Sequence, residues 1–334
     1  MTQRRIRLAG VPAVSAVVLL AGAAAASAAP ANPDPGARSA AAHPAAASQH
    51  AQQNVREYWT PQRMRNAESA STLIDKSGQQ AGSAPVERGK PTTVPPAHGK
   101  AGKVTEVLNE IGAAWEKGGK VTKTTGKVFF TLGGKDYVCS GSAVNSQNKD
   151  VVLTAGHCVN EGPGAFATKW MFAPGYDQGK TPHGEWTARK LYTTSQWKNS
   201  GDISYDVGFA AMNTLNGKHL VGAVGGQGIG FNQDRGQMMY SFGYPAGSPY
   251  DGQDLIYCAG TVQDDPTGRT NDQGMKCNMT GGSSGGPWFV NFDPTTGTGT
   301  LNSVNSFKYR GDPKMYGPYF GSAVQQVYQT AQTA

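Results

Sequence analysis

Val151-Val152-Leu153-Thr154-Ala155-Gly156-His157-Cys158 is the stretch that decides how the rest of the sequence is interpreted. Its first half is a run of apolar and β-branched residues, which is typical of a short buried strand. The run ends at a histidine followed directly by a cysteine. A disulfide at this cysteine would hold the histidine backbone rigid, as a general base requires. A lone histidine is more often structural than catalytic. None of the other histidines ends an apolar run next to a cysteine; they are His43, His50, His98, His183 and His219.

Short strand-like runs continue on both sides of this stretch, separated by turns rich in Gly, Asn, Asp and Pro. We expect strands at 128–132, 137–144, 151–154, 169–172, 207–212, 238–242, 255–262, 288–290 and 301–307, and a closing helix over about 319–331. The segment 226–230 resembles a nucleotide-binding loop only faintly and is expected to be a turn, because no βαβ pattern surrounds it. Many short strands without intervening helices predict an all-β protein built of antiparallel barrels or a sandwich.

A second informative stretch is Gly281-Gly282-Ser283-Ser284-Gly285-Gly286-Pro287. A nucleophilic serine needs an exposed hydroxyl, and flanking glycines let the backbone turn tightly and let substrate approach. The backbone N–H groups of Gly282 and Ser284 would then point at one spot and stabilise an oxyanion. A flexible Gly/Ser loop is the alternative for this stretch alone, and the presence of His157 favours the catalytic interpretation.

A carboxylate is needed to fix the tautomer of such a histidine. Asp206 begins an apolar strand, so we expect it to be buried, where an unpaired acid would be costly. Asp202 is the rival candidate, but it lies in a Gly/Ser turn and is expected to be solvated.

The order of these residues along the chain separates two folds. Gly282-x-Ser284-x-Gly286 also fits the nucleophile elbow of an α/β-hydrolase, which places its acid and its histidine after the serine. No histidine follows Ser284 in this sequence, so that fold has none to use. The order His157, Asp206, Ser284 is the order found in chymotrypsin-like proteases.

In these segments the chain resembles the chymotrypsin-like serine endopeptidases, and it looks closer to their secreted bacterial branch, which includes the glutamyl endopeptidases. The resemblance covers roughly residues 124–334 and rests on Thr154-Ala155-Gly156-His157-Cys158 and on Gly285-Gly286-Pro287 after the serine. It implies two antiparallel six-stranded β-barrels with the catalytic triad His157, Asp206 and Ser284 in the cleft between them. It also implies a Cys139–Cys158 disulfide, an oxyanion hole of Gly282 and Ser284, and substrate contacts by the strand that carries Ser306 and Phe307.

The sequence departs from the family at the residue before the nucleophile. Animal members have an aspartate there, which receives the new N-terminal ammonium on activation, whereas this chain has Ser283. We therefore expect a propeptide to assist folding or to block the cleft instead. By register, the base of the primary specificity pocket would lie near Asn278, which lacks the carboxylate that selects Lys or Arg. The glutamate-selecting histidine of the glutamyl branch would fall near Asn305 and is also absent.

Residues 1–29 have the pattern of a secretory signal peptide. Arginines precede an apolar run over 11–26, and Ala26-Ser27-Ala28 supplies the small residues of a cleavage site. Proline, serine and glycine interrupt the run, which argues against a membrane anchor. Arg4-Arg5 leaves a twin-arginine signal as an alternative.

Residues 30–123 are expected to be a propeptide and linker, mostly disordered, ahead of a serine protease domain at 124–334. Residues 30–50 are rich in Ala, Pro and Ser and have almost no large apolar side chains, and 51–103 carry only scattered aromatics. The segment 104–117 has apolar residues at helical spacing. Residues 1–123 hold 15 Lys/Arg against 8 Asp/Glu, whereas residues 124–334 hold 15 of each. The body of the protein therefore has no net charge, and nucleic-acid binding is not expected.

Four cysteines, an even number in an exported chain, indicate disulfides. Three pairings are open; local pairing would close two loops of 19 positions, each worth about 3 kcal/mol. No close Cys-x-x-Cys pair is present, which argues against a zinc site. The cysteines are Cys139, Cys158, Cys258 and Cys277.

These observations together predict a secreted, extracellular, monomeric serine endopeptidase that works through an acyl-enzyme and needs no metal or cofactor. Its expected partners are protein or peptide substrates and its own propeptide, with no nucleic acid and no stable membrane anchor. The alternatives are a catalytically silent binding protein on the same fold and an esterase.

Overall fold

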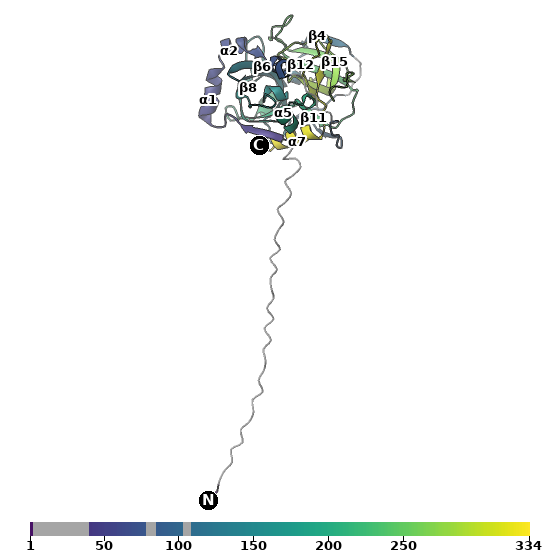
Figure 1. Cartoon of the computed structure of the whole chain (residues 1–334). Helices are drawn as coiled ribbons and strands as arrows, with labels where there is room; N and C mark the ends of the chain where they lie inside the picture. Colours follow the sequence, from purple (N-terminus) through teal and green to yellow (C-terminus); the bar gives the residue numbers. More distant parts are fainter. Residues whose placement is uncertain (3–39, 78–84, 103–107) are drawn as a thin grey trace. The chain divides into compact units, whose positions relative to one another are not determined.

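The computed structural model describes residues 1–2, 40–77, 85–102 and 108–334 (Figure 1). All the elements below belong to one unit, Asp34–Ala334; of the other unit, Met1–Pro33, only the first two residues are described. The signal peptide expected over 1–29 therefore lies outside the described residues, apart from residues 1 and 2. The same holds for the first part of the expected propeptide, up to residue 39.

Six antiparallel strands close into a barrel that contains the strand before His157. Their order is β5-β6-β7-β10-β9-β8, and pairing of β8 with β9 closes the ring. The strands are β5 (Thr125–Leu132), β6 (Lys135–Val144), β7 (Val151–Thr154), β8 (Thr168–Pro174), β9 (Trp186–Thr194) and β10 (Gly208–Met212). β7 has the bounds expected from the sequence, and all four of its residues are buried.

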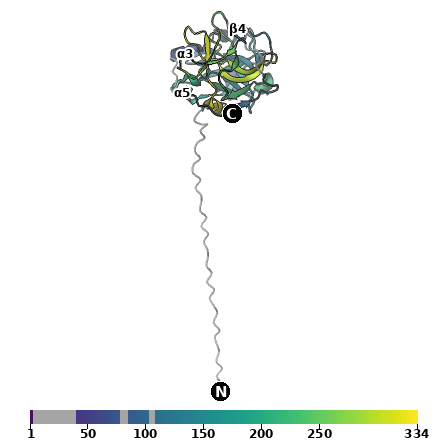
Figure 2. The same cartoon turned by 90° about the vertical axis from the view of Figure 1, so that its right-hand side faces the viewer.

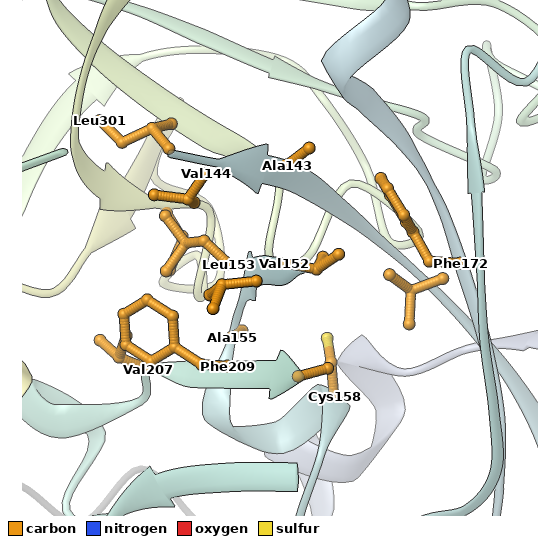
Figure 3. Packing of buried hydrophobic residues seen from close by; sticks show 14 of the residues in the cluster. Ala143, Val144, Val152, Leu153, Ala155, Cys158, Phe172, Val207, Phe209 and Leu301 are labelled. Carbon is orange, nitrogen blue, oxygen red and sulfur yellow. The ribbon is translucent and has the colours of Figure 1, made fainter. Parts of the chain in front are cut away.

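Side chains of alternating strand positions fill the barrel, as the two-residue period of a strand requires. Val128 and Phe130 of β5 belong to the main apolar core, whereas Phe129 between them belongs to a separate cluster outside the barrel. Figure 3 shows part of the core, where residues of β6, β7, β8 and β10 meet and Leu301 of the second sheet joins them. One continuous core therefore connects the barrel to the second half of the protein.

The second half is built on a seven-stranded sheet in the order β3-β11-β17-β16-β12-β13-β4. Its strands are β3 (Thr92–Val94), β4 (Glu110–Ala114), β11 (Gly228–Phe231), β12 (Met238–Gly243), β13 (Ile256–Thr261), β16 (Pro287–Asp293) and β17 (Thr298–Val304). β11 and β17 run parallel. The predicted all-β class and one six-stranded barrel are therefore confirmed, whereas no pairing among the described residues closes this second sheet into a barrel. The short strands β14 (Gln263–Asp264), β15 (Gln273–Lys276) and β18 (Lys314–Gly317) form a sheet of their own.

Residues 40–77 pack on the first barrel, so the expectation of a mostly disordered segment does not hold for them. β1 (Ala40–Pro44) pairs with β9, and β2 (Glu68–Ser69) pairs with β6. The helices α1 (Gln49–Tyr58) and α2 (Pro61–Asn66) lie over β8 and β6 (Figure 1).

Few apolar side chains are enough to hold this segment, because the barrel supplies the other half of the core. Trp59 is 2% exposed, packs on Phe129 and donates from Nε1 to Lys169 O at 2.6 Å. Two local sequence signals mark the helix starts: Ser48 caps α1, and Thr60 caps α2 with a proline directly after it. Composition alone predicts disorder for this segment because it contains no information about packing against a distant part of the chain.

Two further expectations differ from the structure. The apolar spacing over 104–117 predicted a helix, but Glu110–Ala114 of this segment form strand β4, which pairs with β13. Residues 103–107 lie outside the described residues. The expected turn at 226–230 contains the start of β11, where a Cβ on Gly228 would lie 2.9 Å from Val94 O of β3. Glycine is needed there for close strand approach rather than for a turn.

The C-terminal helix α7 (Ser322–Ala331) is present as expected and buries Val324, Val327 and Tyr328. In the described part of the chain, none of the helices is long and apolar enough to cross a membrane.

Both disulfides join cysteines that are local in sequence, Cys139–Cys158 and Cys258–Cys277. Of the three pairings left open by the sequence, this is the local one, and the first bridge agrees with the family resemblance. Each bridge closes a loop with a sequence separation of 19.

Replacing Cys258 and Cys277 together with serine is expected to lower the free energy of unfolding by about 3 kcal/mol, because the unfolded chain regains the freedom of that loop. Urea unfolding followed by tryptophan fluorescence measures the change. An unchanged unfolding midpoint at equal slope would show that this bridge does not constrain the unfolded chain.

Candidate active site

His157 follows β7 directly and lies in the short helix η2 (Gly156–Cys158), which the Cys139–Cys158 bridge ties to β6. The ring is 1% exposed. Gly156 beside it permits the close approach of a carboxylate, since a Cβ there would lie 2.8 Å from Asp206 Oδ1. The sequence at this point therefore fixes both the position of the histidine and the space next to it.

Asp206 is completely buried and accepts three hydrogen bonds. His157 donates to it twice, from Nδ1 at 2.8 Å and from its backbone N at 2.7 Å, and Ser306 Oγ donates at 2.6 Å. Because Nδ1 faces a carboxylate, it carries the ring proton in the neutral imidazole, which leaves Nε2 as the basic nitrogen.

The backbone around Asp206 is held by hydroxyl groups of β9. Thr193 donates to Val207 O at 2.8 Å, and Thr194 donates to Tyr205 O at 2.7 Å. The rival candidate Asp202 accepts from Ser204 N and caps the short helix η3 (Ile203–Tyr205). It is 8% exposed, so the expectation that it is solvated does not hold.

His157 Nε2 is buried and has no hydrogen-bond partner among the described residues. It therefore does not bind the Ser284 hydroxyl in this structure. Hydrogen bonds between a catalytic base and its nucleophile are often long before substrate binds.

The turn that carries Ser284 is held against the disulfide beside His157. Ser140 N, next to Cys139, donates to Ser284 O at 2.7 Å, and Cys158 Sγ lies 3.8 Å from the same oxygen. Gly282 and Gly285 adopt positive φ angles of 96° and 77°. A Cβ on Gly285 would also collide with Thr154 Oγ1. The glycines are thus required by backbone conformation and by contact with the first barrel.

Two buried backbone donors in this turn are unengaged. The N–H groups of Ser283, Gly285 and Gly286 donate to carbonyl oxygens of the protein. Those of Gly282 and Ser284, which are buried, and that of the half-buried Gly281 donate to no acceptor in the part of the chain that the structure describes. Backbone N–H groups at buried positions are nearly always paired, so two unpaired donors in one turn are available to a ligand oxygen.

Asn305 is a residue whose structural importance the sequence analysis did not recognise. Its side chain is completely buried and makes four hydrogen bonds: it accepts from Ser241 Oγ and Trp288 Nε1 and donates to Phe242 O and Ser283 O. The residue thereby fixes the nucleophile turn from behind. In the sequence Asn305 falls inside the expected strand 301–307, and that pattern does not set it apart as a structural residue.

A cavity of about 190 Å³ adjoins Ser284. Ser306 and Phe307 line it, as the family resemblance implies, together with Lys308 and Met315. Lys308 donates to Cys277 O at 2.7 Å, and burial lowers the pKa of its ammonium group. Among the described lining residues it is the only one with a charged side chain.

Asn278 does not line this cavity, so the expected base of the specificity pocket is not found there. Its side chain is exposed and accepts from Tyr250 Oη at 2.5 Å, while its backbone N donates to Ile111 O at 2.7 Å. Ile111 belongs to β4, which precedes residues 124–334, the segment whose positions were matched to those of the protease family. The register therefore could not include this contact.

The side chain of Ser283, directly before Ser284, is engaged within the protein. Its hydroxyl donates to Thr280 O at 2.8 Å, within the same turn. No carboxylate is present at this position to receive an N-terminal ammonium group.

Comparison with known proteins assigns the family. The model of the trypsin-like peptidase domain matches residues 139–293, which contain His157, Asp206 and Ser284. The protease Anisep from Arthrobacter nicotinovorans is 48% identical over 68% of this chain and 99% of its own, with a TM-score of 0.60. The thermostable serine protease AL20 from an extremophilic microorganism is 45% identical over 64% of this chain and 99% of its own, with a TM-score of 0.61.

The fold is also shared with a Glu endopeptidase, at 18% identity over 68% of this chain and 99% of the other and a TM-score of 0.53. The chain belongs to the trypsin-like serine proteases and is a peptidase.

A shorter match is to a Bacillus subtilis protein named extracellular metalloprotease, at 34% identity over 77 residues. The match takes in 23% of this chain and 24% of that protein, so this chain spans about a quarter of its length. The described residues contain one group with the spacing of metal ligands, Cys139, His157 and Cys158. Its two sulfur atoms are bonded to each other in the disulfide, so they cannot act as thiolate ligands.

Asn305→Ala is expected to lower the free energy of unfolding by at least about 3 kcal/mol, because it leaves several buried polar groups without partners. Peptidase activity per folded molecule should fall as well, since Ser283 O loses its donor. Thermal unfolding and activity titrated against folded protein test both effects. A stable variant with full activity would mean that the turn keeps its shape without this side chain.

Asp272 is another buried carboxyl group close to the site. Burial raises the pKa of this carboxyl group well above its usual value, and the negative charge of Asp206 raises the pKa further. Both of its carboxyl oxygens lack hydrogen-bond partners among the described residues. The pKa of Asp272 is therefore higher in the folded protein than in the unfolded chain. The free energy of unfolding decreases as pH rises from the unfolded pKa toward the folded pKa.

Asp272→Asn is expected to unfold at higher urea concentration than the natural chain at pH 7, with a difference that shrinks toward pH 4, because the amide carries no charge to bury. Urea midpoints measured from pH 4 to pH 7 test this. A difference that stays constant over that range would show that this carboxyl group titrates alike in both states.

Proposed function

We propose that this chain is an exported serine endopeptidase that hydrolyses peptide bonds with His157, Asp206 and Ser284. One observation carries the proposal: a buried imidazole is oriented by Asp206 through Nδ1 and keeps Nε2 unengaged. The turn with Ser284 is held against the disulfide that adjoins this histidine. These are the parts that a general base and a nucleophile require.

In the proposed reaction Ser284 Oγ attacks the scissile carbonyl carbon, and His157 Nε2 takes the hydroxyl proton. Asp206 stabilises the imidazolium that forms. The unengaged N–H groups of Gly282 and Ser284 bind the oxyanion, an effect of about 3 kcal/mol for a single donor. The tetrahedral intermediate collapses as His157 protonates the leaving amine, and an acyl-enzyme on Ser284 remains.

Water completes the cycle. His157 takes a proton from the water molecule, whose oxygen attacks the acyl carbon, and then returns a proton to Ser284 Oγ as the new carboxyl group leaves. Ser306 acts as a positioning residue through its hydrogen bond to Asp206.

The cavity beside Ser284 argues against a preference for basic side chains. Its lining residues among those described include Lys308 and no carboxylate. A lysine or arginine of a substrate would therefore meet a like charge there and no opposite one.

Export is supported by the signal-like residues at the N-terminus and by two disulfides, since such bridges persist in oxidising compartments. The Bacillus subtilis relative is itself named as extracellular.

Ser284→Ala is expected to lower turnover of a peptide substrate by several orders of magnitude, on the scale of about 10⁶ for such a triad, while unfolding remains unchanged. Ser283→Ala is the matched control, because it removes a neighbouring hydroxyl that donates only within the turn. Its turnover should stay within about tenfold of the natural chain. A loss of less than about tenfold in Ser284→Ala would remove this residue from the nucleophile role.

Labelling with a fluorophosphonate separates the proposal from its alternatives. A working triad reacts at Ser284, whereas a silent binding protein on the same fold does not react. If the protein reacts with the probe, assays of fresh, unlabelled protein with peptide and ester substrates then distinguish an endopeptidase from an esterase.

A further inference from the structure

A second cavity, of about 320 Å³, adjoins the nucleophile turn at Gly281. Gly281 and Ser71 line both this cavity and the one at Ser284, so the two cavities are neighbours. Ser71 begins helix α3 (Ser71–Ser77), which is labelled in Figure 2. The wall of the second cavity includes Lys127 of β5 and Val138 of β6, so this cavity lies toward the first barrel.

Lys127 is the only buried lysine or arginine among the described residues, with 3% of its surface exposed. Its Nζ donates to Gly252 O at 2.9 Å and lies 4.6 Å from the centroid of the Tyr176 ring. None of the ion pairs in the described part of the chain includes it. Buried cations are normally paired, because their removal from water is costly. An unpaired buried ammonium group that borders a cavity is therefore suited to an anionic ligand.

The other charges around this cavity also favour an anion. Arg65 adds a second cation to the wall, and Asp251 is the one acidic residue among the described lining residues. Asp251 is exposed, and its Oδ1 accepts from Gln253 N at 3.0 Å. Burial lowers the pKa of the Lys127 ammonium to about 8, and the charge of Asp251 opposes this effect. The lysine therefore keeps its proton at pH 7, where its charge is only partly compensated.

The position of the cavity places it on the leaving-group side of the proposed reaction. Ser306 and Phe307 line the cavity at Ser284, which is the one suited to the side chain before the scissile bond. The second cavity lies beyond Gly281, whose carbonyl oxygen accepts from Ala246 N at 2.7 Å. A peptide that continues past Ser284 and away from the first cavity therefore passes the wall that carries Lys127.

We propose that Lys127 selects substrates with an aspartate or glutamate among the first three residues after the scissile bond, by pairing its ammonium group with the side-chain carboxylate. This inference rests on the proposed function, because it names a substrate feature for the same site. A carboxylate in the cavity compensates the buried charge and accepts a charge-assisted hydrogen bond, which is stronger than a neutral one. A glutamine at the same place leaves the ammonium charge uncompensated.

The test compares peptides that differ only in Glu or Gln at one of the first three positions after the scissile bond. The parent peptide is one that the active enzyme, purified after expression of the full chain, cleaves at a single bond. At one of these positions kcat/KM for Glu should exceed kcat/KM for Gln by about tenfold or more, as expected of a hydrogen bond between charged groups. Liquid chromatography with mass spectrometry measures both the rate and the bond cleaved.

Two substitutions of the lysine separate its charge from its packing. Lys127→Met removes the charge and keeps most of the side-chain volume, so the Glu preference should be lost, whereas Lys127→Arg should retain it. Lys190→Met is the matched control. Lys190 also lies over a tyrosine ring, 5.3 Å from the centroid of Tyr192, and it lines neither cavity. Its Glu-to-Gln ratio should equal that of the natural enzyme, and circular dichroism confirms that each variant is folded.

The pH dependence tests the same contact without a substitution. Lys127 loses its proton as pH rises through about 8, so the Glu-to-Gln ratio of kcat/KM should fall between pH 7 and pH 9.5. The other ionisable groups that face the ammonium are Asp251, Arg65 and Tyr176. Carboxylates and guanidinium groups do not titrate in this range, and burial raises the pKa of the Tyr176 hydroxyl above its usual value. Ionisation of His157 affects both peptides alike and cancels in the ratio.

The outcomes separate the two proposals. A Glu preference that disappears in Lys127→Met and falls at high pH supports the specificity role. Equal rates for Glu and Gln at all three positions, or a preference that persists in Lys127→Met, would overturn it, while the proposed function stands. An equal loss on both peptides in Lys127→Met would assign this lysine to structure alone and overturn it as well. If no peptide is cleaved in a Ser284-dependent manner, the proposed function itself fails, and the specificity role fails with it.

Discussion

The buried carboxylate of Asp206 is the constraint on which the rest of the site depends. A charge without water must be compensated, and here three donors do so: two from His157 and one from Ser306. Asp206 precedes β10 of the first barrel, whereas Ser306 follows β17 of the second sheet. The same interaction therefore orients the imidazole and joins the two halves of the protein. A small displacement of one half against the other would leave this charge partly uncompensated.

The second half contributes a turn rather than a rigid element, and the surrounding residues supply the rigidity. Asn305 holds the turn from behind, the hydrogen bond from Ser140 N holds Ser284 O, and glycines allow the backbone to lie against β6 and β7. Most hydrogen-bonding groups of the turn are engaged in these contacts. Among the buried N–H groups of the turn, those of Gly282 and Ser284 are unengaged, and they are the two that the proposed chemistry uses. This agrees with the rule that unsatisfied buried groups have a functional reason.

The sequence predicted what depends on short patterns. β7 was found at its observed bounds, and His157 was placed at its end, because an apolar run, a glycine and a cysteine are all local signals. The carboxylate partner of His157 followed from the expected burial of Asp206. What failed depended on distant contacts. Residues 40–77 have few apolar side chains of their own and pack in an apolar cluster shared with barrel residues, and the backbone N of Asn278 donates to Ile111 O of β4, a segment outside the register used for the prediction. Neither effect appears in composition or spacing.

The pairing of β1 with β9 has a consequence for handling the protein. Ala40–Pro44 satisfy one side of the backbone along Lys190–Thr194, where β8 no longer reaches. A chain that has shed this strand presents an open sheet edge, and open edges attract strands of other molecules. The tendency to associate is thus linked to the N-terminal residues: a protein without this strand would self-associate more readily at high concentration than one that keeps it.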